Sequence, residues 1–414
     1  MDRIMYKDDL LYCEGVSVEE IVKKVGTPLY IYSANTILDH YRKFDAAFEK
    51  VEHLICYSVK VNSNIAIIKL LSDEGSGFDI VSGGELYRVI EACSDTSKVV
   101  YAGVGKTDDE ITMALKNNIM LFNIESFTEA ERINEIAKKM GRVANIAVRI
   151  NPDVEAKTHK FIITGTKENK FGLPIDKAFE IFAFLKDLKA LNVVGIHSHI
   201  GSQLVSVEPY IKAVSKLNKL INNLRTNGFK IEILNIGGGY GIIYKDENPP
   251  TPFELSNAIL PLIKDLNLKL LMEPGRLIVG NSGILVTKVL YYKESYSKNF
   301  VIVDAGMNDL IRPAFYEAYH RVEYIRKRSD TELKKVDIVG PVCESADFFA
   351  QDYEMNIPLS GDLLAIRSAG AYGFSMASNY NSRPRCAEVL VDGKDFRIIR
   401  KRESYRDIIR GESL

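Results

Sequence analysis

The sequence predicts an α/β protein in which a (β/α)8 TIM barrel is followed by a mainly antiparallel β domain. Between residues 35 and 278, eight short apolar runs alternate with helical patterns, which is the order of elements in a parallel barrel. After Val279 the strand-like runs follow one another with little helix between them, which indicates an antiparallel sheet. A chain of 414 residues also exceeds what one hydrophobic core usually fills, so two domains are expected.

A short leading segment, residues 1–34, precedes the barrel. It contains strand-like runs at 10–13 and 29–32 and a helix-like pattern at 18–22. The segment is too short to bury a core by itself. We therefore expect it to complete the C-terminal β domain, which we place at residues 279–414.

The apolar runs of the barrel mark its strands. They end near Lys60, Ser82, Gly103, Glu125, Asn151, His199, Gly237 and Glu273. Capping boxes are predicted after the third and fourth runs, at Thr107 with Glu110 and at Ser126 with Glu129. The longest loop, residues 152–172, has a length that is usually kept for a mobile, functional segment. An open, doubly wound sheet is the structural alternative to the closed barrel.

The C-terminal domain is defined by six further strand-like runs. These runs lie at residues 284–286, 300–303, 336–339, 363–366, 387–391 and 396–399. Helical patterns between them are short, so a mainly antiparallel β domain is expected.

Composition narrows the class of protein. The formal net charge of -1 gives no general affinity for nucleic acid or for an acidic membrane. Five cysteines without tight spacing argue for a reducing compartment and against a disulfide framework. The charged N-terminus and the lack of a long apolar run argue against a signal peptide and a membrane span. A soluble cytoplasmic protein is expected.

The first barrel run, Cys56–Val61, carries a lysine near its carboxyl end, where TIM barrels place their active sites. A lysine there could form a Schiff base, and we take Lys60 as the candidate. The alternative is a strand-edge lysine whose ammonium group reaches solvent.

Other strand ends add polar groups and glycines. The glycine triplet Gly237–Gly239 opens the loop after the seventh run, a position where barrels commonly bind phosphate through backbone N–H groups. His199 is followed by Gly201 and Ser202, which are further potential phosphate donors. Each of these has a structural alternative, a tight turn for the glycines and a satisfied core residue for the histidine.

Glu273 ends a strand otherwise made of Leu and Met, where an acid is costly unless it is paired. Arg149 or a cationic ring nitrogen could pair with it. A lysine amine, a phosphate cup, a flat imidazole and a carboxylate for a pyridine nitrogen together indicate a pyridoxal phosphate site. Metal binding is disfavoured, because we expect His197 and His199 to point to opposite faces of their strand and not to share one ion.

Five motifs resemble those of the diaminopimelate decarboxylases, pyridoxal phosphate enzymes with the alanine racemase-like fold. The motifs are Tyr57-Ser58-Val59-Lys60-Val61-Asn62, Gly77-Phe78-Asp79-Ile80-Val81-Ser82-Gly83-Gly84-Glu85-Leu86, His197-Ser198-His199-Ile200-Gly201-Ser202-Gln203, Glu273-Pro274-Gly275-Arg276 and Gly340-Pro341-Val342-Cys343-Glu344-Ser345-Ala346-Asp347. The first four look like the whole decarboxylase group, and the last distinguishes the diaminopimelate enzymes.

The resemblance implies a role for each matching residue. Lys60 would bind pyridoxal 5'-phosphate covalently, and His199 would stack on its ring. Glu273 would meet the ring nitrogen. The remaining cofactor-binding positions would be Ser202, Gly238, Gly239, Gly275, Arg276 and Tyr372.

The substrate and the assembly follow from the same resemblance. The substrate's distal carboxylate would be bound by Arg276, Arg312 and Tyr316, with Tyr372 nearby, and its distal amine by Glu344. Cys343, the expected proton donor, and Glu344 would reach the active site of the neighbouring subunit, which implies a homodimer.

The implied activity is decarboxylation of meso-2,6-diaminopimelate to L-lysine and carbon dioxide, the last step of lysine biosynthesis by the diaminopimelate pathway. A related decarboxylase acting on arginine, ornithine or carboxynorspermidine is the second reading. A non-catalytic homologue that binds protein partners is a remote third, because such proteins lose the lysine or the cysteine.

Overall fold

The computed structural model describes residues 3–93, 95–154 and 170–414, and the chain forms two compact units. The first unit comprises Met1–His40, Ile243–Glu247 and Ile278–Leu414, and the second comprises Tyr41–Ile242 and Asn248–Leu277. Most of the predicted 152–172 loop falls at 155–169, outside the described residues.

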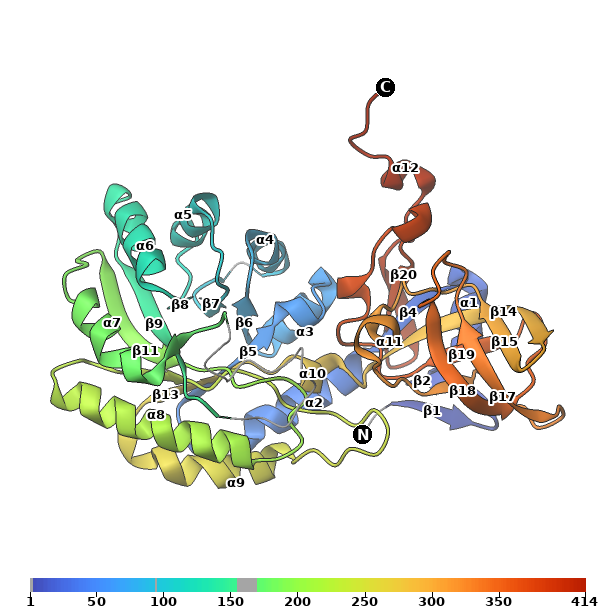
Figure 1. The fold of residues 1–414 in the computed structure, drawn as a ribbon, viewed down its shortest axis with the longest axis horizontal. Coiled ribbons are helices and arrows are strands. Elements are labelled where there is room, and N and C mark those ends of the chain that lie inside the picture. Colours follow the sequence, from blue (N-terminus) through green and yellow to red (C-terminus); the bar gives the residue numbers. More distant parts are fainter. Residues whose placement is uncertain (1–2, 94, 155–169) are drawn as a thin grey trace. The chain divides into compact units, whose positions relative to one another are not determined.

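Eight parallel strands close into a barrel in the second unit (Figure 1). They are β5 (His53–Ser58), β6 (Gly77–Ile80), β7 (Val99–Tyr101), β8 (Leu121–Ile124), β9 (Ala144–Asn151), β11 (Leu191–His197), β12 (Ile233–Asn235) and β13 (Lys269–Met272). The pairing of β8 with β9 joins the two ends of the sheet. The predicted barrel is therefore confirmed, and the open sheet is excluded. A two-residue strand, β10 (Leu173–Pro174), pairs with β9.

One helix precedes the first barrel strand, and the others connect successive strands on the outside of the barrel in Figure 1. They are α2 (Ala34–Ala47), α3 (Ile65–Asp73), α4 (Gly83–Ala92), α5 (Asp108–Lys116), α6 (Phe127–Lys139), α7 (Ala178–Leu185), α8 (Glu208–Thr226) and α9 (Pro252–Ile263). The long helix α8 shows why these segments form helices with one buried face. Its apolar residues recur every three or four positions and are buried.

One predicted capping box is confirmed and the other is wrong. Thr107 and Glu110 cap α5 reciprocally. Ser126 caps α6 by accepting from the Glu129 N–H, but the Glu129 carboxylate accepts from the N–H of Glu125 and from Lys106. The two carboxylate oxygens are thus bonded to Lys106 and to Glu125 and not to the Ser126 N–H, so the reciprocal half of the box does not form.

The barrel interior changes from apolar to polar along the strands. Apolar side chains from several strands pack together inside it, namely Leu54, Cys56, Val100, Leu121, Ala147, Val194 and Leu271. Buried polar side chains lie at or near the carboxyl ends, namely Asp79, Asn123, Arg149, His197, Asn235 and Glu273. Burying polar groups costs free energy unless they are bonded, so this polar end needs a further explanation.

The first unit contains two sheets and three short helices. The small sheet consists of β1 (Ile4–Lys7), β2 (Leu10–Cys13) and β3 (Val16–Ser17), followed by α1 (Val18–Val25). The large sheet contains β4 (Leu29–Ser33), β14 (Gly283–Ser295), β15 (Lys298–Val303), β16 (Val322–Tyr324), β17 (Leu333–Val339), β18 (Phe348–Asn356), β19 (Leu363–Ile366), β20 (Ala387–Asp392) and β21 (Asp395–Arg400). The other helices are α11 (Arg312–Tyr316) and α12 (Tyr405–Ile408), and α10 (Arg276–Val279) leads into the unit.

The N-terminal segment supplies a central strand of this large sheet. Strand β4 pairs with β14 in antiparallel register and with β20 in parallel register. The sheet is thus mixed, although most of its pairs are antiparallel. The sequence missed β16, which is only three residues long, and β18, whose apolar residues at the start are followed by the polar pair Gln351-Asp352.

Strand β5 is shorter than predicted. It ends at Ser58, and Val59–Val61 form a 3₁₀ turn that carries Lys60. The Ser58 N–H donates to the Pro274 carbonyl at 3.2 Å, and the Ser58 hydroxyl lies 2.9 Å from Asp79 Oδ2. These bonds turn the chain away from the barrel wall, so Lys60 lies just beyond the strand and not within it.

Among the described residues, no helix has both the length and the apolar character needed to cross a bilayer.

Candidate functional site

The ammonium group of Lys60 lies beside a buried carboxylate. Lys60 Nζ is 2.6 Å from Asp79 Oδ2, and Asp79 itself is fully buried at the end of β6. Burial, followed by the nearby charge of Glu273, raises the pKa of Asp79, while Lys60 and the Ser58 hydroxyl work in the opposite direction. The lysine is therefore held at the polar end of the barrel and is not a strand-edge residue directed to solvent.

Glu273 follows β13 and has one partner on the adjacent strand β12 and another on β11, the strand beyond it. Its Oε1 accepts from Asn235 Nδ2 at 2.7 Å, and its Oε2 lies 3.3 Å from His197 Nε2. Burial alone would raise the pKa of Glu273, but His197 first and then Lys60 outweigh it and hold that pKa well below its usual range. Glu273 is thus a buried, ionised carboxylate.

His199 accepts a hydrogen bond from the glycine loop. The Gly238 N–H donates to His199 Nδ1 at 3.0 Å, so in the neutral ring the proton lies on Nε2. Burial, followed by the positive charges of Arg149 and Lys60, lowers the pKa of His199 to about 3. The imidazole is neutral at physiological pH and offers a flat, uncharged face.

The expectation that His197 and His199 point to opposite faces is wrong. Strand β11 ends at His197, and residues two positions apart in an extended chain share a face in any case. His197 contacts Glu273, and the charge of Glu273 also acts on His199. Both histidines therefore belong to the same polar end of the barrel.

The loop after β12 must consist of glycine at its centre. A Cβ atom on Gly238 would lie 2.2 Å from the Glu273 carbonyl oxygen, and one on Gly239, whose φ is +98°, would lie 2.4 Å from the Gly201 carbonyl oxygen. These close approaches leave bare backbone at the strand end, as a phosphate cup requires. At Gly238 the structure shows two features: backbone packed too closely for a Cβ atom, and an N–H that already bonds His199.

Ser202 and Arg276 lie together. Arg276 Nη2 donates to Ser202 Oγ at 3.0 Å, and the arginine is almost fully buried. Gly275 precedes it and packs against the Lys60 turn, since a Cβ atom there would lie 2.3 Å from Val61 Cγ2. The predicted phosphate serine, the arginine and the lysine turn are therefore parts of one assembly.

Several buried polar atoms at this end have no hydrogen-bond partner among the described residues. They are Asp79 Oδ1, both side-chain polar atoms of Asn123, His197 Nδ1 and Ser198 Oγ. Buried polar groups in proteins are nearly always bonded, so unmet atoms grouped around an amine and a carboxylate indicate a polar ligand. The donor set fits pyridoxal phosphate: an amine for its aldehyde, a carboxylate for its ring nitrogen and a glycine loop for its phosphate.

Sequence reasoning gave no role to several residues that build this site. Asp79, His197 and Asn235 were visible as polar positions at the ends of apolar strands, but their partners could not be identified. A second buried pair joins Arg149 Nη1 to Glu125 Oε1 at 2.9 Å, and Glu125 Oε2 accepts from the Gly172 N–H at 2.8 Å. The sequence analysis had named Arg149 as a possible partner of Glu273, but the arginine pairs with Glu125 instead.

The remaining predicted residues belong to the first unit. Arg312 opens α11 and is almost fully buried, and Tyr316 closes that helix. Tyr372 has a φ of +56°, an uncommon backbone conformation for a tyrosine that is found more often at functional sites. Cys343 and Glu344 are exposed in the single chain.

Asp347 builds the loop that carries Cys343. Its carboxylate accepts from the N–H groups of Met307 and Val342, each at 2.6 Å. The Cys343 N–H donates to Asn381 Oδ1 at 2.7 Å. The loop is thus bonded from two sides, and it presents the cysteine outward in a defined conformation.

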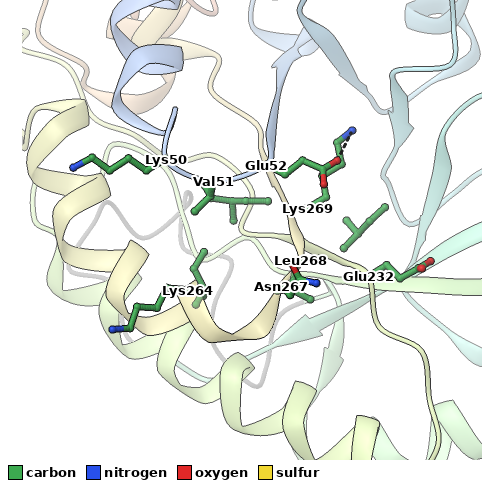
Figure 2. Close-up of a pocket in the computed structure, with 11 residues that line it drawn as sticks. Lys50, Val51, Glu52, Glu232, Lys264, Asn267, Leu268 and Lys269 are labelled. Atoms are coloured by element: carbon green, nitrogen blue, oxygen red, sulfur yellow. Dashed lines mark ion pairs between the residues drawn. The ribbon is translucent and has the colours of Figure 1, made fainter.

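A cavity of about 540 Å³ lies at the opposite end of the barrel and is not the candidate site (Figure 2). Its walls come from the chain before β5, β12 and β13, and they carry Lys50, Glu52, Lys264 and Lys269. Glu52 and Lys269 form an ion pair at 3.7 Å. TIM barrels place their chemistry at the carboxyl ends of the strands, and conserved features at the other end support stability.

Glu85 yields a test of the electrostatics near Lys60. Burial, the largest cause, raises the pKa of Glu85 from 4.5 to about 7. The folded carboxyl keeps its proton to higher pH than the unfolded one, so its contribution to stability is complete below about pH 4.5 and is lost as the pH rises toward 7. Relative to the parent, Glu85→Gln should gain up to about 3 kcal/mol in free energy of unfolding over this pH range.

Urea unfolding at several pH values measures this effect. Glu91→Gln, which makes the same change at an exposed position of α4, provides the baseline. A difference between the Glu85 variant and the parent that does not vary with pH would contradict the assignment.

Comparison with known proteins places this geometry in a family. Residues 34–280 match the family described as "Pyridoxal-dependent decarboxylase, pyridoxal binding domain". The chain is 48% identical over 407 residues to the diaminopimelate decarboxylase of Aquifex aeolicus, covering 98% of this chain and 96% of that protein. It is 47% identical over 414 residues to the diaminopimelate decarboxylase of Pseudomonas aeruginosa, covering 100% of this chain and 99% of that protein.

A solved structure agrees in fold. The diaminopimelate decarboxylase of M. jannaschii in co-complex with L-lysine superposes with a TM-score of 0.95 at 40% identity, covering 100% of this chain and 98% of that one.

Proposed function

The chain belongs to the pyridoxal-dependent decarboxylases and, among them, to the diaminopimelate decarboxylases, and from this premise we propose which residues carry out each part of the reaction. The reaction converts meso-2,6-diaminopimelate to L-lysine and carbon dioxide with pyridoxal phosphate as cofactor. One observation carries the proposal: a partly exposed amine after the first barrel strand and a buried, ionised carboxylate after the last lie at the same polar end of the barrel.

We propose that Lys60 binds the cofactor covalently and that Glu273 faces its ring nitrogen. The cofactor, when bound, supplies an electron sink for the bond pair that carbon dioxide leaves behind. A buried carboxylate with a depressed pKa stabilises a positive charge opposite it, and Asn235 and His197 hold that carboxylate in place. The neutral ring of His199 would supply a flat stacking surface without competing for that carboxylate.

The proposed phosphate site consists of Ser202, Gly238 and Gly239, with Gly275 and Arg276 next to it. The contact between Arg276 and Ser202 supports this grouping, as does the close packing around the two loop glycines. A guanidinium beside a hydroxyl and bare backbone is a suitable environment for an anion.

The proposed substrate residues suit a molecule with an amino acid group at each end. Arg276, Arg312 and Tyr316 would bind the distal carboxylate, and Glu344 would bind the distal ammonium, with Tyr372 nearby. Planar guanidinium groups bind a carboxylate through two parallel hydrogen bonds, and a carboxylate suits an ammonium. A substrate without a distal carboxylate, such as ornithine, would leave buried arginine charge without its intended partner.

We propose that Cys343 donates a proton from Sγ to the substrate Cα after carbon dioxide has left, and that it does so in the neighbouring subunit of a homodimer. The exposure of Cys343 and Glu344 in the single chain supports this, together with the well-bonded loop that presents them. In a symmetric dimer such a contribution is reciprocal, so each copy would complete the active site of the other.

Replacing Cys343 with alanine should lower turnover by about 10²- to 10⁴-fold, the range for a lost proton donor. Cofactor absorbance should persist, because this change leaves Lys60 intact. Mixing the Cys343→Ala and Lys60→Ala proteins under conditions that exchange subunits should restore up to about a quarter of the parent activity, because half of the dimers are hybrids with one complete site.

The control mixes each inactive variant with itself, and activity is measured as lysine released from meso-diaminopimelate. Mixtures that stay inactive while subunit exchange is demonstrated would contradict a shared site. Full activity of Cys343→Ala alone would remove the cysteine from the proposal.

We also propose residues 35–278 as the cofactor-binding domain and residues 279–414 with 1–34 as the second domain. The family match over residues 34–280 supports this division. All five cysteines are unpaired, which supports our proposal that the protein works in the cytoplasm.

A further inference from the structure

The buried guanidinium of Arg312 is held from two directions within the first unit. Its Nε donates to His320 Nε2 at 3.2 Å. Its Cζ lies 5.2 Å from the centre of the Tyr244 ring, within the range of a cation–π contact. The Tyr244 ring in turn meets the His320 ring edge to face, with the ring centres 5.4 Å apart.

The contacts of His320 determine which of its nitrogens carries the proton. His320 is 1% exposed, and its Nδ1 lies 2.8 Å from the Arg367 carbonyl oxygen. A carbonyl can only accept and an arginine Nε–H can only donate, so Nδ1 carries the proton and Nε2 offers its lone pair. A doubly protonated ring would direct an N–H at the arginine and lose this bond.

The carbonyl that orients His320 is itself fixed to the sheet. Arg367 directly follows β19, and its N–H donates to the Arg321 carbonyl at 2.8 Å. Its side chain bonds Glu323, on the neighbouring strand β16, and the Ile4 carbonyl. A chain of bonds therefore runs from a rigid sheet through His320 to Arg312.

We propose that His320 is a positioning residue for substrate specificity, which sets the plane of the Arg312 guanidinium for the distal carboxylate of the substrate. The proposal rests on the role given above to Arg312. With Nε directed to His320, the arginine can present only its terminal nitrogens to a carboxylate, and Tyr244 restricts rotation of the plane. Without His320, a long flexible side chain would have to be ordered by the substrate itself.

Replacing His320 with leucine should raise the KM for meso-diaminopimelate by about tenfold, the effect of a lost hydrogen bond to a charged group, with little change in kcat. His320→Gln, whose amide can both accept from Arg312 and donate to the Arg367 carbonyl, should stay close to the parent. His320→Phe keeps a ring of similar volume but lacks the acceptor nitrogen. It should raise the KM in the same way, and it replaces the leucine variant if that variant does not fold.

Two inhibitors separate the distal carboxylate from the rest of the substrate. L-lysine carries that carboxylate and 1,5-diaminopentane does not, so His320→Leu should weaken inhibition by the first and leave the second unchanged. The double variant Arg312→Met/His320→Leu should be no worse than Arg312→Met alone, because His320 acts through the arginine. Cofactor absorbance should be unchanged throughout.

His53→Leu is the matched control, since both of its ring nitrogens are also bonded, to Val51 and Asp45, at the far end of the barrel strands. An unchanged KM in His320→Leu alongside a raised KM in Arg312→Met would overturn the proposal and leave the role of Arg312 intact. Equal weakening of both inhibitors, or additive effects in the double variant, would also overturn it. If Arg312→Met leaves the KM unchanged, the substrate-binding role proposed for Arg312 is contradicted, and with it the role of His320.

Discussion

Replacing Lys60 with alanine should lower kcat/KM for meso-diaminopimelate by more than about a thousandfold, because the covalent link to the cofactor is lost. The protein should still fold. The Lys60 ammonium is partly exposed, and Asp79, its partner, already has a pKa raised by burial, so the carboxyl can take up a proton when the lysine is removed.

Lys60→Arg is the informative control for this result. It keeps a positive charge beside Asp79 but has no amine that can form a Schiff base. We expect it to be as inactive as the alanine variant while keeping the parent's thermal stability more closely. Substantial activity in Lys60→Arg would show that the charge, and not the covalent chemistry, is what the site requires.

Replacing Glu273 with glutamine should lower kcat by about 10²- to 10³-fold, the scale for losing one preorganised electrostatic group. Glutamine keeps the shape and can still accept from Asn235, but it removes the negative charge that the pKa of Glu273 preserves. The positive charge on the ring nitrogen, which Glu273 is proposed to face, would then have no counter-charge. Steady-state kinetics measure the fall in kcat. The cofactor absorption spectrum separately measures the effect of the lost counter-charge.

Glu388→Gln controls for the loss of a buried acid. Glu388 is fully buried in the first unit, where it accepts from Tyr32 and pairs with Arg400. The Glu388 change should cost stability without altering the cofactor spectrum or kcat. If Glu273→Gln and Glu388→Gln reduced kcat alike, the effect would be one of stability and Glu273 would have no electrostatic role.

The sequence predicted the barrel well because alternation along the chain is local information. Each apolar run predicts one strand, and each helical pattern predicts the helix that connects it to the next strand. A parallel sheet follows from the alternation of the two. Lys60, His199, Gly238 and Glu273 were selected on the same grounds, since strand ends can be read without any knowledge of which strands are neighbours.

Contacts across the barrel were beyond sequence reasoning. The bond from Asn235 to Glu273 and the pairing of Arg149 with Glu125 depend on register and on which strands lie side by side. Nothing in the sequence showed that the Glu129 carboxylate would bond Lys106 and the Glu125 N–H instead of completing a capping box. The turn at Lys60 was missed for a related reason, since Ser58 is diverted by bonds to distant residues.

The substrate-binding residues show the same limit. Arg312 was found by resemblance, but His320 was not, although it lies only eight positions further along the chain. Its role becomes visible only when the sheet brings the Arg367 carbonyl to its other nitrogen. A buried histidine with two defined partners cannot be distinguished from an ordinary core residue until those partners are known.

The most direct test of the central claim is borohydride reduction of the enzyme loaded with pyridoxal phosphate, followed by peptide mapping. We expect a single pyridoxyl group on Lys60, and none in Lys60→Ala treated in the same way. A pyridoxyl group on another lysine of the active parent enzyme, or no adduct at all, would contradict the assignment of Lys60 and with it the chemistry proposed for the barrel site.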